Sequence, residues 1–203
     1  MFSLIFSMFT FSLSMSISPG PVNITILSSS MNYGLKQTFA FISGATIGFT
    51  ALLAAVCFGL YQVISLYPIL LNIITVLGTG LLVWMGWNIA RAQGESIQTD
   101  QLELPKAPSF MQGALLQWLN PKAWIAAVSG TALFSASHNA LYLFLFIFIY
   151  FVVCYLSLLI WGYAGQKLAV FLNQGSRMRV FNMVMGVLLM FIALQMSWSH
   201  FYA

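Results

Sequence analysis

The sequence predicts an all-α integral membrane protein of six transmembrane helices, arranged as a 3+3 inverted repeat with broken first and fourth helices. Of its 203 residues, 61% are hydrophobic and 5% are charged, whereas a soluble domain carries about 25% charged residues. A transmembrane helix needs about 20 mostly apolar residues, so the chain has room for roughly six. One long polar stretch, residues 92–109, divides the apolar runs into two sets of three.

The first half, residues 1–91, is expected to contain helices at roughly 2–30, 39–63 and 67–91. Its first apolar run begins without a basic residue and exceeds the length of a secretory signal, so we expect it to be retained as a helix. The second helix carries a stripe of small residues that includes Gly44 and Gly48. This GxxxG spacing lets two helix backbones approach closely. We expect the neighbouring helix to belong to the same chain, and a homo-oligomer contact is the alternative.

The second half, residues 110–203, is expected to contain helices at roughly 110–136, 140–166 and 180–201. The linker at 92–109 holds all three acidic residues of the chain and two of its six prolines. We therefore expect it to be a solvated cytoplasmic loop. The halves and the linker together form a single transmembrane domain over residues 1–203.

Basic residues gather in alternate loops. The loops after the first, third and fifth helices carry Lys36, Arg91, Lys106, Lys167, Arg177 and Arg179, and the other loops and both tails carry none. Cytoplasmic loops collect Lys and Arg, so both termini are expected outside. These scattered residues form no basic patch, so we expect no nucleic-acid partner.

Two stretches interrupt the pattern of a plain membrane helix. The first break is Ser18-Pro19-Gly20-Pro21-Val22-Asn23, in the first helix, and the second break is Leu119-Asn120-Pro121-Lys122-Ala123-Trp124, in the fourth. Both lie deep in their predicted spans. Three helices per half is an odd number, so the second half enters the membrane from the opposite side. Paired interruptions in an inverted repeat are a pointer to a transporter's binding site near the bilayer midplane.

Proline explains why these stretches should face a polar cavity. It lacks an N–H and clashes with the carbonyl four residues earlier. Pro19 therefore frees the carbonyl of Met15, and Pro21 frees that of Ile17. Pro121 has the same effect in the fourth helix. An unpaired backbone group costs several kcal/mol in hydrocarbon, so such backbone persists inside protein or against water.

The chemistry of a break suits a small zwitterion such as an amino acid. The helix that restarts after a break has free N–H groups and a dipole that favour an anion. The helix that ends at the break has free carbonyls that favour a cation. We therefore expect a substrate site made of seven residues: Pro19, Gly20, Pro21, Asn23, Asn120, Pro121 and Lys122.

Lys122 is the basic residue predicted at the core of a span. A lysine there costs about 2.5–3.5 kcal/mol on insertion scales, and no Asp or Glu lies in any predicted span to pair with it. We expect its partner to be a substrate carboxylate, freed carbonyls or water, and the alternative is that it bonds the freed backbone alone. Asn23 and Asn120 can donate and accept, so each can satisfy a break or contact substrate.

With these residues in view, the chain resembles the LysE/RhtB family of amino-acid exporters. The matching stretches are the first break, Gly34, the Gly44–Gly48 region, Leu82-Val83-Trp84-Met85-Gly86-Trp87, and Asn120-Pro121-Lys122-Ala123. The resemblance implies a bacterial inner-membrane exporter of amino acids or derivatives, driven by the proton gradient. Residues 16–135 look nearest to the cysteine and O-acetylserine exporters. Proton antiport rests on the resemblance, since no predicted span contains a carboxylate.

Three other functions were weighed. A membrane thiol–disulfide carrier would use Cys57 and Cys154, which fall in symmetry-related helices, but neither adjoins a break or a cation in the sequence. A channel or a non-transporting assembly protein would need polar residues spread along several helices. An enzyme would need a nucleophile, base and acid, and no such set is visible. The cysteine spacing matches no metal site, so no metal or cofactor is expected.

Overall fold

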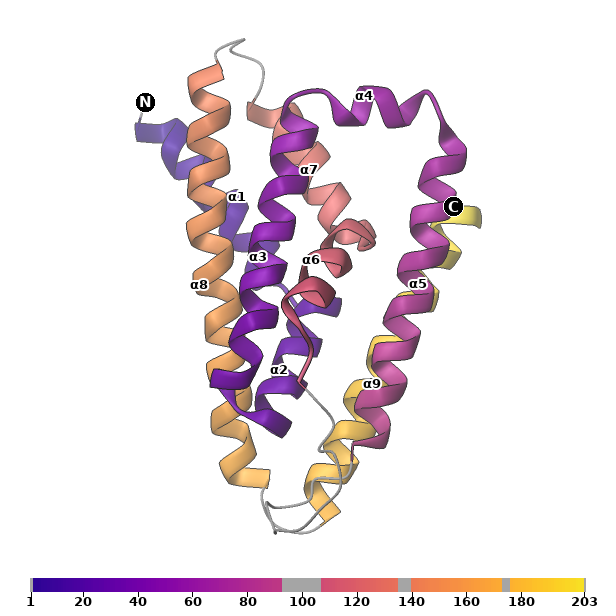
Figure 1. Cartoon of the computed structure of the whole chain (residues 1–203). Helices are drawn as coiled ribbons and strands as arrows, with labels where there is room; N and C mark the ends of the chain where they lie inside the picture. Colours follow the sequence, from indigo (N-terminus) through magenta and orange to yellow (C-terminus); the bar gives the residue numbers. More distant parts are fainter. Residues whose placement is uncertain (1, 93–106, 135–139, 173–175, 203) are drawn as a thin grey trace.

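The computed structural model describes residues 2–92, 107–134, 140–172 and 176–202. Within these residues the chain forms nine α-helices (Figure 1). They are α1 (Phe2–Ile17), α2 (Pro21–Tyr33), α3 (Leu35–Cys57), α4 (Leu60–Ser65), α5 (Pro68–Arg91), α6 (Phe110–Trp118), α7 (Pro121–Phe134), α8 (Ala140–Leu172) and α9 (Ser176–Tyr202). The all-α prediction is confirmed for the described residues. Both predicted breaks interrupt a helix, between α1 and α2 and between α6 and α7.

Three predicted helix boundaries were wrong. The second helix was expected to reach residue 63, but α3 ends at Cys57 and the short helix α4 follows. Gly59 lies at φ 109° in the intervening turn, a backbone conformation that glycine adopts at little cost. The fifth helix runs to Leu172 instead of 166, because residues 166–172 contain no proline or glycine to end it. The sixth begins at Ser176 instead of 180.

The chain is a multi-pass membrane protein. Among the described residues, four helices are long and apolar enough to cross a membrane: α3, the Asn72–Arg91 part of α5, α8, and the Arg177–Ser199 part of α9. The pair α1–α2, bent by 59° at the first break, makes a fifth candidate span. The predicted fourth helix is divided into α6, of 9 residues, and α7, of 14 residues. The count of six spans therefore stays a prediction.

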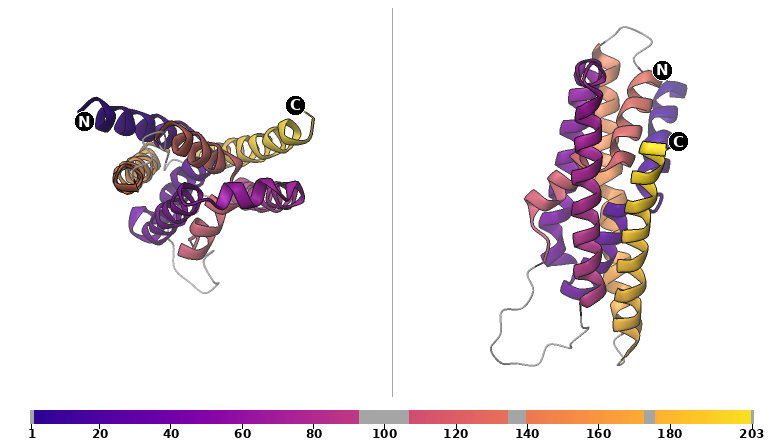
Figure 2. Two further views of the ribbon diagram at one scale, coloured as in Figure 1. Left: turned by 90° about the horizontal axis from the view of Figure 1, so that it is seen from above. Right: turned by 90° about the vertical axis from the view of Figure 1, so that its right-hand side faces the viewer.

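The helices form a bundle with a two-helix arm. In the bundle, α8 packs against α1 and α2, while α3 packs against α6, α7 and α8. The arm is the pair α5 and α9, which pack along each other and project to one side (Figures 1 and 2). Phe41, Leu52 and Phe146 are fully buried in the bundle.

Small residues on α3 allow a close approach to a neighbouring helix, as their spacing in the sequence predicted. A Cβ added to Gly44 would overlap the carbonyl oxygen of Phe110, and one added to Gly48 would lie 2.6 Å from Cα of Ala114. The stripe therefore packs against α6 of the same chain, which confirms the intrachain expectation.

A buried amide pair joins the arm to the bundle. Asn182 of α9 has no exposed surface. Its Nδ2 donates to Asn32 Oδ1 at 2.8 Å and to the carbonyl oxygen of Ala92 at 3.0 Å, and Asn32 Nδ2 donates to Asn182 Oδ1 at 3.0 Å. The pair therefore ties the end of α2 to the start of α9 and to the residue after α5.

Charge separates the two ends of the molecule. The first residues of α1 and the last of α9 lie toward one end, and the start of α3 and the end of α5 lie at the other (Figure 1). Apart from Lys122, the described basic residues lie at the end of the molecule where α3 starts and α5 ends. They are Lys36, Arg91, Lys167, Arg177 and Arg179. This separation agrees with the alternation seen in the sequence, and the direction of insertion stays a prediction.

Candidate functional site

The two breaks meet inside the bundle through Lys122. Its Nζ donates to the carbonyl oxygen of Ser18 at 2.7 Å, to Ser18 Oγ at 2.9 Å, and weakly to the carbonyl oxygen of Pro19 at 3.5 Å. The two partners are 104 residues apart in sequence. The half-buried ammonium of the second break is therefore held by backbone of the first, which is one of the partners that the sequence predicted.

The carbonyls freed by the prolines of the first break are met by other donors. The Ser18 hydroxyl donates to the carbonyl oxygen of Met15 at 3.2 Å, and Trp161 Nε1 of α8 donates to that of Ile17 at 3.1 Å. Asn23 Nδ2 donates to the carbonyl oxygen of Ser16 at 2.9 Å. The backbone carbonyls in the last turn of α1 thus accept hydrogen bonds from side chains of α2, α8 and the break itself.

The backbone carbonyls before the second break also accept hydrogen bonds. The backbone N–H of Asn120 donates to the carbonyl oxygen of Gln117 at 3.3 Å, and Trp124 Nε1 donates to that of Trp118 at 2.7 Å. The two indole rings meet edge to face, with centroids 6.4 Å apart. Trp124 is buried, so its indole packs within the protein.

The helices that restart at the breaks differ in how their first N–H groups are used. Asn120 caps α7, because its Oδ1 accepts from the backbone N–H of Lys122 at 3.1 Å and its carbonyl oxygen accepts from that of Ala123 at 2.9 Å. Gly20 precedes α2 in extended backbone, Pro21 is the first residue, and no side chain among the described residues caps this helix. A Cβ on Gly20 would lie 3.0 Å from Lys122 Nζ. The uncapped N-terminus of α2 therefore lies beside the ammonium group.

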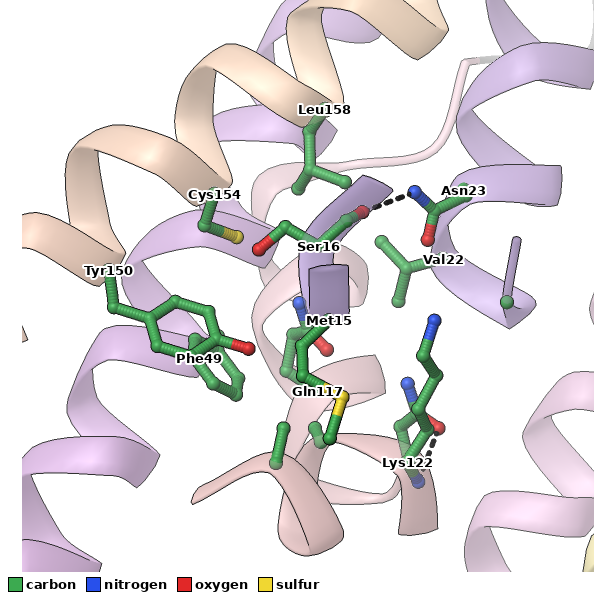
Figure 3. A pocket seen from close by; sticks show the side chains of 14 residues that line it. Met15, Ser16, Val22, Asn23, Phe49, Gln117, Lys122, Tyr150, Cys154 and Leu158 are labelled. Atoms are coloured by element: carbon green, nitrogen blue, oxygen red, sulfur yellow. Dashed lines mark hydrogen bonds between the residues drawn. The ribbon is translucent and has the colours of Figure 1, made fainter. Parts of the chain in front are cut away.

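A cavity lies between the breaks, and α1, α2, α3, α6, α7 and α8 all contribute to its wall (Figure 3). Four of the seven predicted residues line it: Gly20, Asn23, Asn120 and Lys122. The three prolines are not among its lining residues. Pro19 is exposed, Pro21 is buried and Pro121 is half-buried. The prolines act on the backbone: they interrupt the helices at the site.

Five polar or aromatic residues of the wall were missed from the sequence: Ser16, Phe49, Gln117, Tyr150 and Cys154. The expectation that Cys154 lies apart from the breaks and the cation was wrong, since it shares the cavity with Lys122. The physical reason is that α8 packs along α1 and α2. The i, i+4 spacing of Tyr150 and Cys154, which places both on one helix face, was the available signal.

The cavity is walled by aromatic rings toward the end where α7 finishes and α8 begins. Tyr150 packs against Phe49 with ring centroids 4.6 Å apart and against Phe146 at 5.7 Å. Phe134 packs against Phe146 at 4.7 Å, and Phe11 lies 5.9 Å from Phe134. These four helices, α1, α3, α7 and α8, therefore close that side of the cavity.

The two cysteines are free thiols in different surroundings. Cys57 Sγ lies 3.2 Å from Thr131 Oγ1, whereas Cys154 lines the cavity. No group of three or more His, Cys, Asp or Glu side chains in the described part of the chain could hold a metal ion.

The family of the chain follows from comparison with known proteins. The family described as LysE type translocator matches residues 13–199. This chain belongs to the LysE family of translocators. The match confirms the resemblance seen in the sequence.

Curated relatives of this LysE-family protein share part of its length. It is 24% identical over 132 residues to the cysteine/O-acetylserine efflux protein of Salmonella typhimurium, covering 64% of this chain and 65% of that protein. It is 27% identical over 135 residues to the protein of the same name from Escherichia coli, covering 65% and 66%. The chain thus spans a little under two thirds of these relatives. No solved structure gives a significant match.

Proposed function

We propose that this LysE-family protein is a secondary active exporter of small amino acids or their derivatives, which it binds as zwitterions in the cavity between the two breaks. The observation that carries the proposal is the ammonium of Lys122 beside the uncapped N-terminus of α2. Both favour an anion, and both border one small cavity.

The substrate carboxylate binds at this end of the cavity. Lys122 Nζ has three donors. Two make short bonds to Ser18, and the third makes only a weak contact of 3.5 Å with the carbonyl oxygen of Pro19. This third donor turns to a carboxylate that also meets the first N–H groups of α2. Gly20 leaves room for this approach, because a Cβ there would contact the lysine side chain.

The substrate ammonium binds to oxygen acceptors of the same cavity. Gln117, near the end of α6, is buried and lines the cavity, and Asn23 and Asn120 line it too. A carbonyl oxygen has two lone pairs, so the carbonyls at the end of α1 can accept from substrate in addition to the protein. A carboxylate site and an ammonium site a few ångströms apart select an α-amino acid.

The names of the relatives support this substrate class. Proteins called cysteine/O-acetylserine efflux proteins match about two thirds of the chain at 24–27% identity. We propose cysteine, O-acetylserine or similarly small amino acids as substrates, moved from the cytoplasm outward across the cell inner membrane. Both termini face the outside, since the basic end of the helices belongs in the cytoplasm.

The proposed transport step relates the two halves of the chain. Helix packing supports a pseudo-two-fold arrangement: the α1–α2 unit packs on α8 as the α6–α7 unit packs on α3, and the mates α5 and α9 pack on each other. We take α6–α7 as the sixth, broken span. Rocking of residues 1–91 against 110–203 then exposes the cavity to either side.

Protons are the proposed coupling ion. Lys122 is the basic residue that lines the cavity.

A thiol–disulfide carrier is the weaker candidate. It needs two cysteines that can exchange with one another or with a partner. Here Cys154 is buried in the cavity wall, while Cys57 contacts Thr131. The two thiols therefore lie in different surroundings, which does not favour exchange between them.

The test is uptake into inside-out vesicles, or efflux from proteoliposomes, with a panel of labelled amino acids. Lys122→Met should abolish transport while the protein remains in the membrane at the wild-type level. Lys36→Met, which removes an exposed lysine at the start of α3, is the matched control and should retain transport. Full activity of Lys122→Met would contradict the proposal.

A further inference from the structure

We infer that the cavity has a separate side-chain subsite, formed by Ser16, Tyr150 and Cys154, which selects small substrate side chains carrying a hydroxyl or thiol. The inference rests on the proposed function, because it assigns the opposite end of the same cavity. The residues of this subsite decide which zwitterion is carried.

The two ends of the cavity differ in chemistry. Lys122 of the second break and Asn23 of the first lie on one side of the cavity, and Gly20 lies beside Lys122. Tyr150 and Cys154 project from α8 on the other side, toward Ser16 of α1 (Figure 3). The first end carries charge, and the second carries uncharged hydroxyl and thiol groups. An amino acid whose carboxylate binds at Lys122 therefore directs its side chain to the second end.

Ser16 supplies an unused hydrogen-bonding group at this second end. Its side chain is 7% exposed, and within the described part of the chain its Oγ makes no hydrogen bond of good geometry, although the Tyr150 hydroxyl and the Cys154 thiol lie near it. A hydroxyl buried without a partner is unfavourable. A substrate hydroxyl or thiol placed here satisfies it, while a methyl group of the same size leaves it unpaired.

Tyr150 fixes the shape of the subsite. The residue is 2% exposed, and its ring packs between Phe49, at 4.6 Å, and Phe146, at 5.7 Å. A ring held by two neighbours presents its hydroxyl in one position, so the polar contact is preorganised. Cys154, 4% exposed, forms the adjoining wall.

The cavity is also small. It offers about 40 Å³ to the centres of water molecules, and one water needs about 10–15 Å³ on that measure. About three water positions fit. Phe49 and Tyr150 border this space, so the cavity favours small substrates.

The experiment uses the purified full chain in proteoliposomes and labelled glycine, alanine, serine, cysteine and leucine. The wild type should carry serine and cysteine faster than alanine and should leave leucine at background. Ser16→Ala should reduce the serine-to-alanine rate ratio about threefold to tenfold, the range for one lost hydrogen bond. Cys154→Val, which narrows the wall, should lower the serine-to-glycine rate ratio.

Cys57→Val is the matched control, since Cys57 is not among the lining residues, and it should keep the wild-type preference. If Cys154→Val loses glycine transport as well, the Ser16→Ala ratio decides. An unchanged serine-to-alanine ratio in Ser16→Ala, in a wild-type protein that transports, would overturn the subsite and leave the exporter proposal intact. Failure of the wild type to carry any amino acid would overturn both.

Discussion

Replacing Gly20 by alanine tests how closely transport depends on the position of the Lys122 ammonium. The new Cβ would lie 3.0 Å from both Cδ and Nζ of Lys122 and 3.5 Å from Cε. Non-bonded carbon atoms prefer about 3.5–4.0 Å, so the lysine side chain has to move by a few tenths of an ångström. Gly20 lies in extended backbone, with φ −162°. Alanine adopts this conformation without strain, so the fold should survive.

The shift weakens the contact between the breaks. The bond from Lys122 Nζ to the carbonyl oxygen of Ser18 is 2.7 Å long, and a displacement of a few tenths of an ångström lengthens it toward about 3.2 Å, the upper end of the usual range. A hydrogen bond to a charged group contributes about 1.5–3 kcal/mol. If half of this is lost in the transport step, the rate falls about threefold to tenfold, since 1.4 kcal/mol is a factor of ten.

The assay is the initial rate of amino-acid efflux from proteoliposomes, normalised to the amount of folded protein. Gly80→Ala is the matched control, because a Cβ at Gly80 meets no atom within 4 Å among the described residues. It should transport at the wild-type rate. A wild-type rate for Gly20→Ala would refute the role given to the ammonium position.

Two further predictions concern stability. Asn120→Ala removes the side-chain cap of α7 and should lower the free energy of unfolding by about 0.5–2 kcal/mol, measured by thermal unfolding in detergent; an unchanged midpoint would show that the cap is dispensable. Asn182→Ala leaves the buried Asn32 amide without its reciprocal partner and should destabilise the protein by about 1–3 kcal/mol. Proteolysis should then release the α5–α9 arm more readily, and equal resistance in the wild type and the variant would contradict this.

Local chemistry made much of this protein readable from its sequence. The two breaks are at the prolines because proline removes a donor and clashes with the preceding turn, which is independent of tertiary context. Gly44 and Gly48 predicted a close helix contact because a backbone can approach only where side chains are small. Lys122 stood out because a charge in a membrane span is costly and needs a specific partner.

The tertiary structure decided which groups meet. No local rule shows that the Lys122 ammonium reaches the carbonyl of Ser18, or that Trp161 of α8 donates to Ile17. Helix α8 is apolar over most of its 33 residues, so the i, i+4 spacing of Tyr150 and Cys154 is only a weak mark of its inward face. Only packing against α1, α2 and α3 turns Tyr150 and Cys154 into the cavity. In a lipid environment apolar side chains are equally suited to protein and to bilayer, and the choice of face rests on shape.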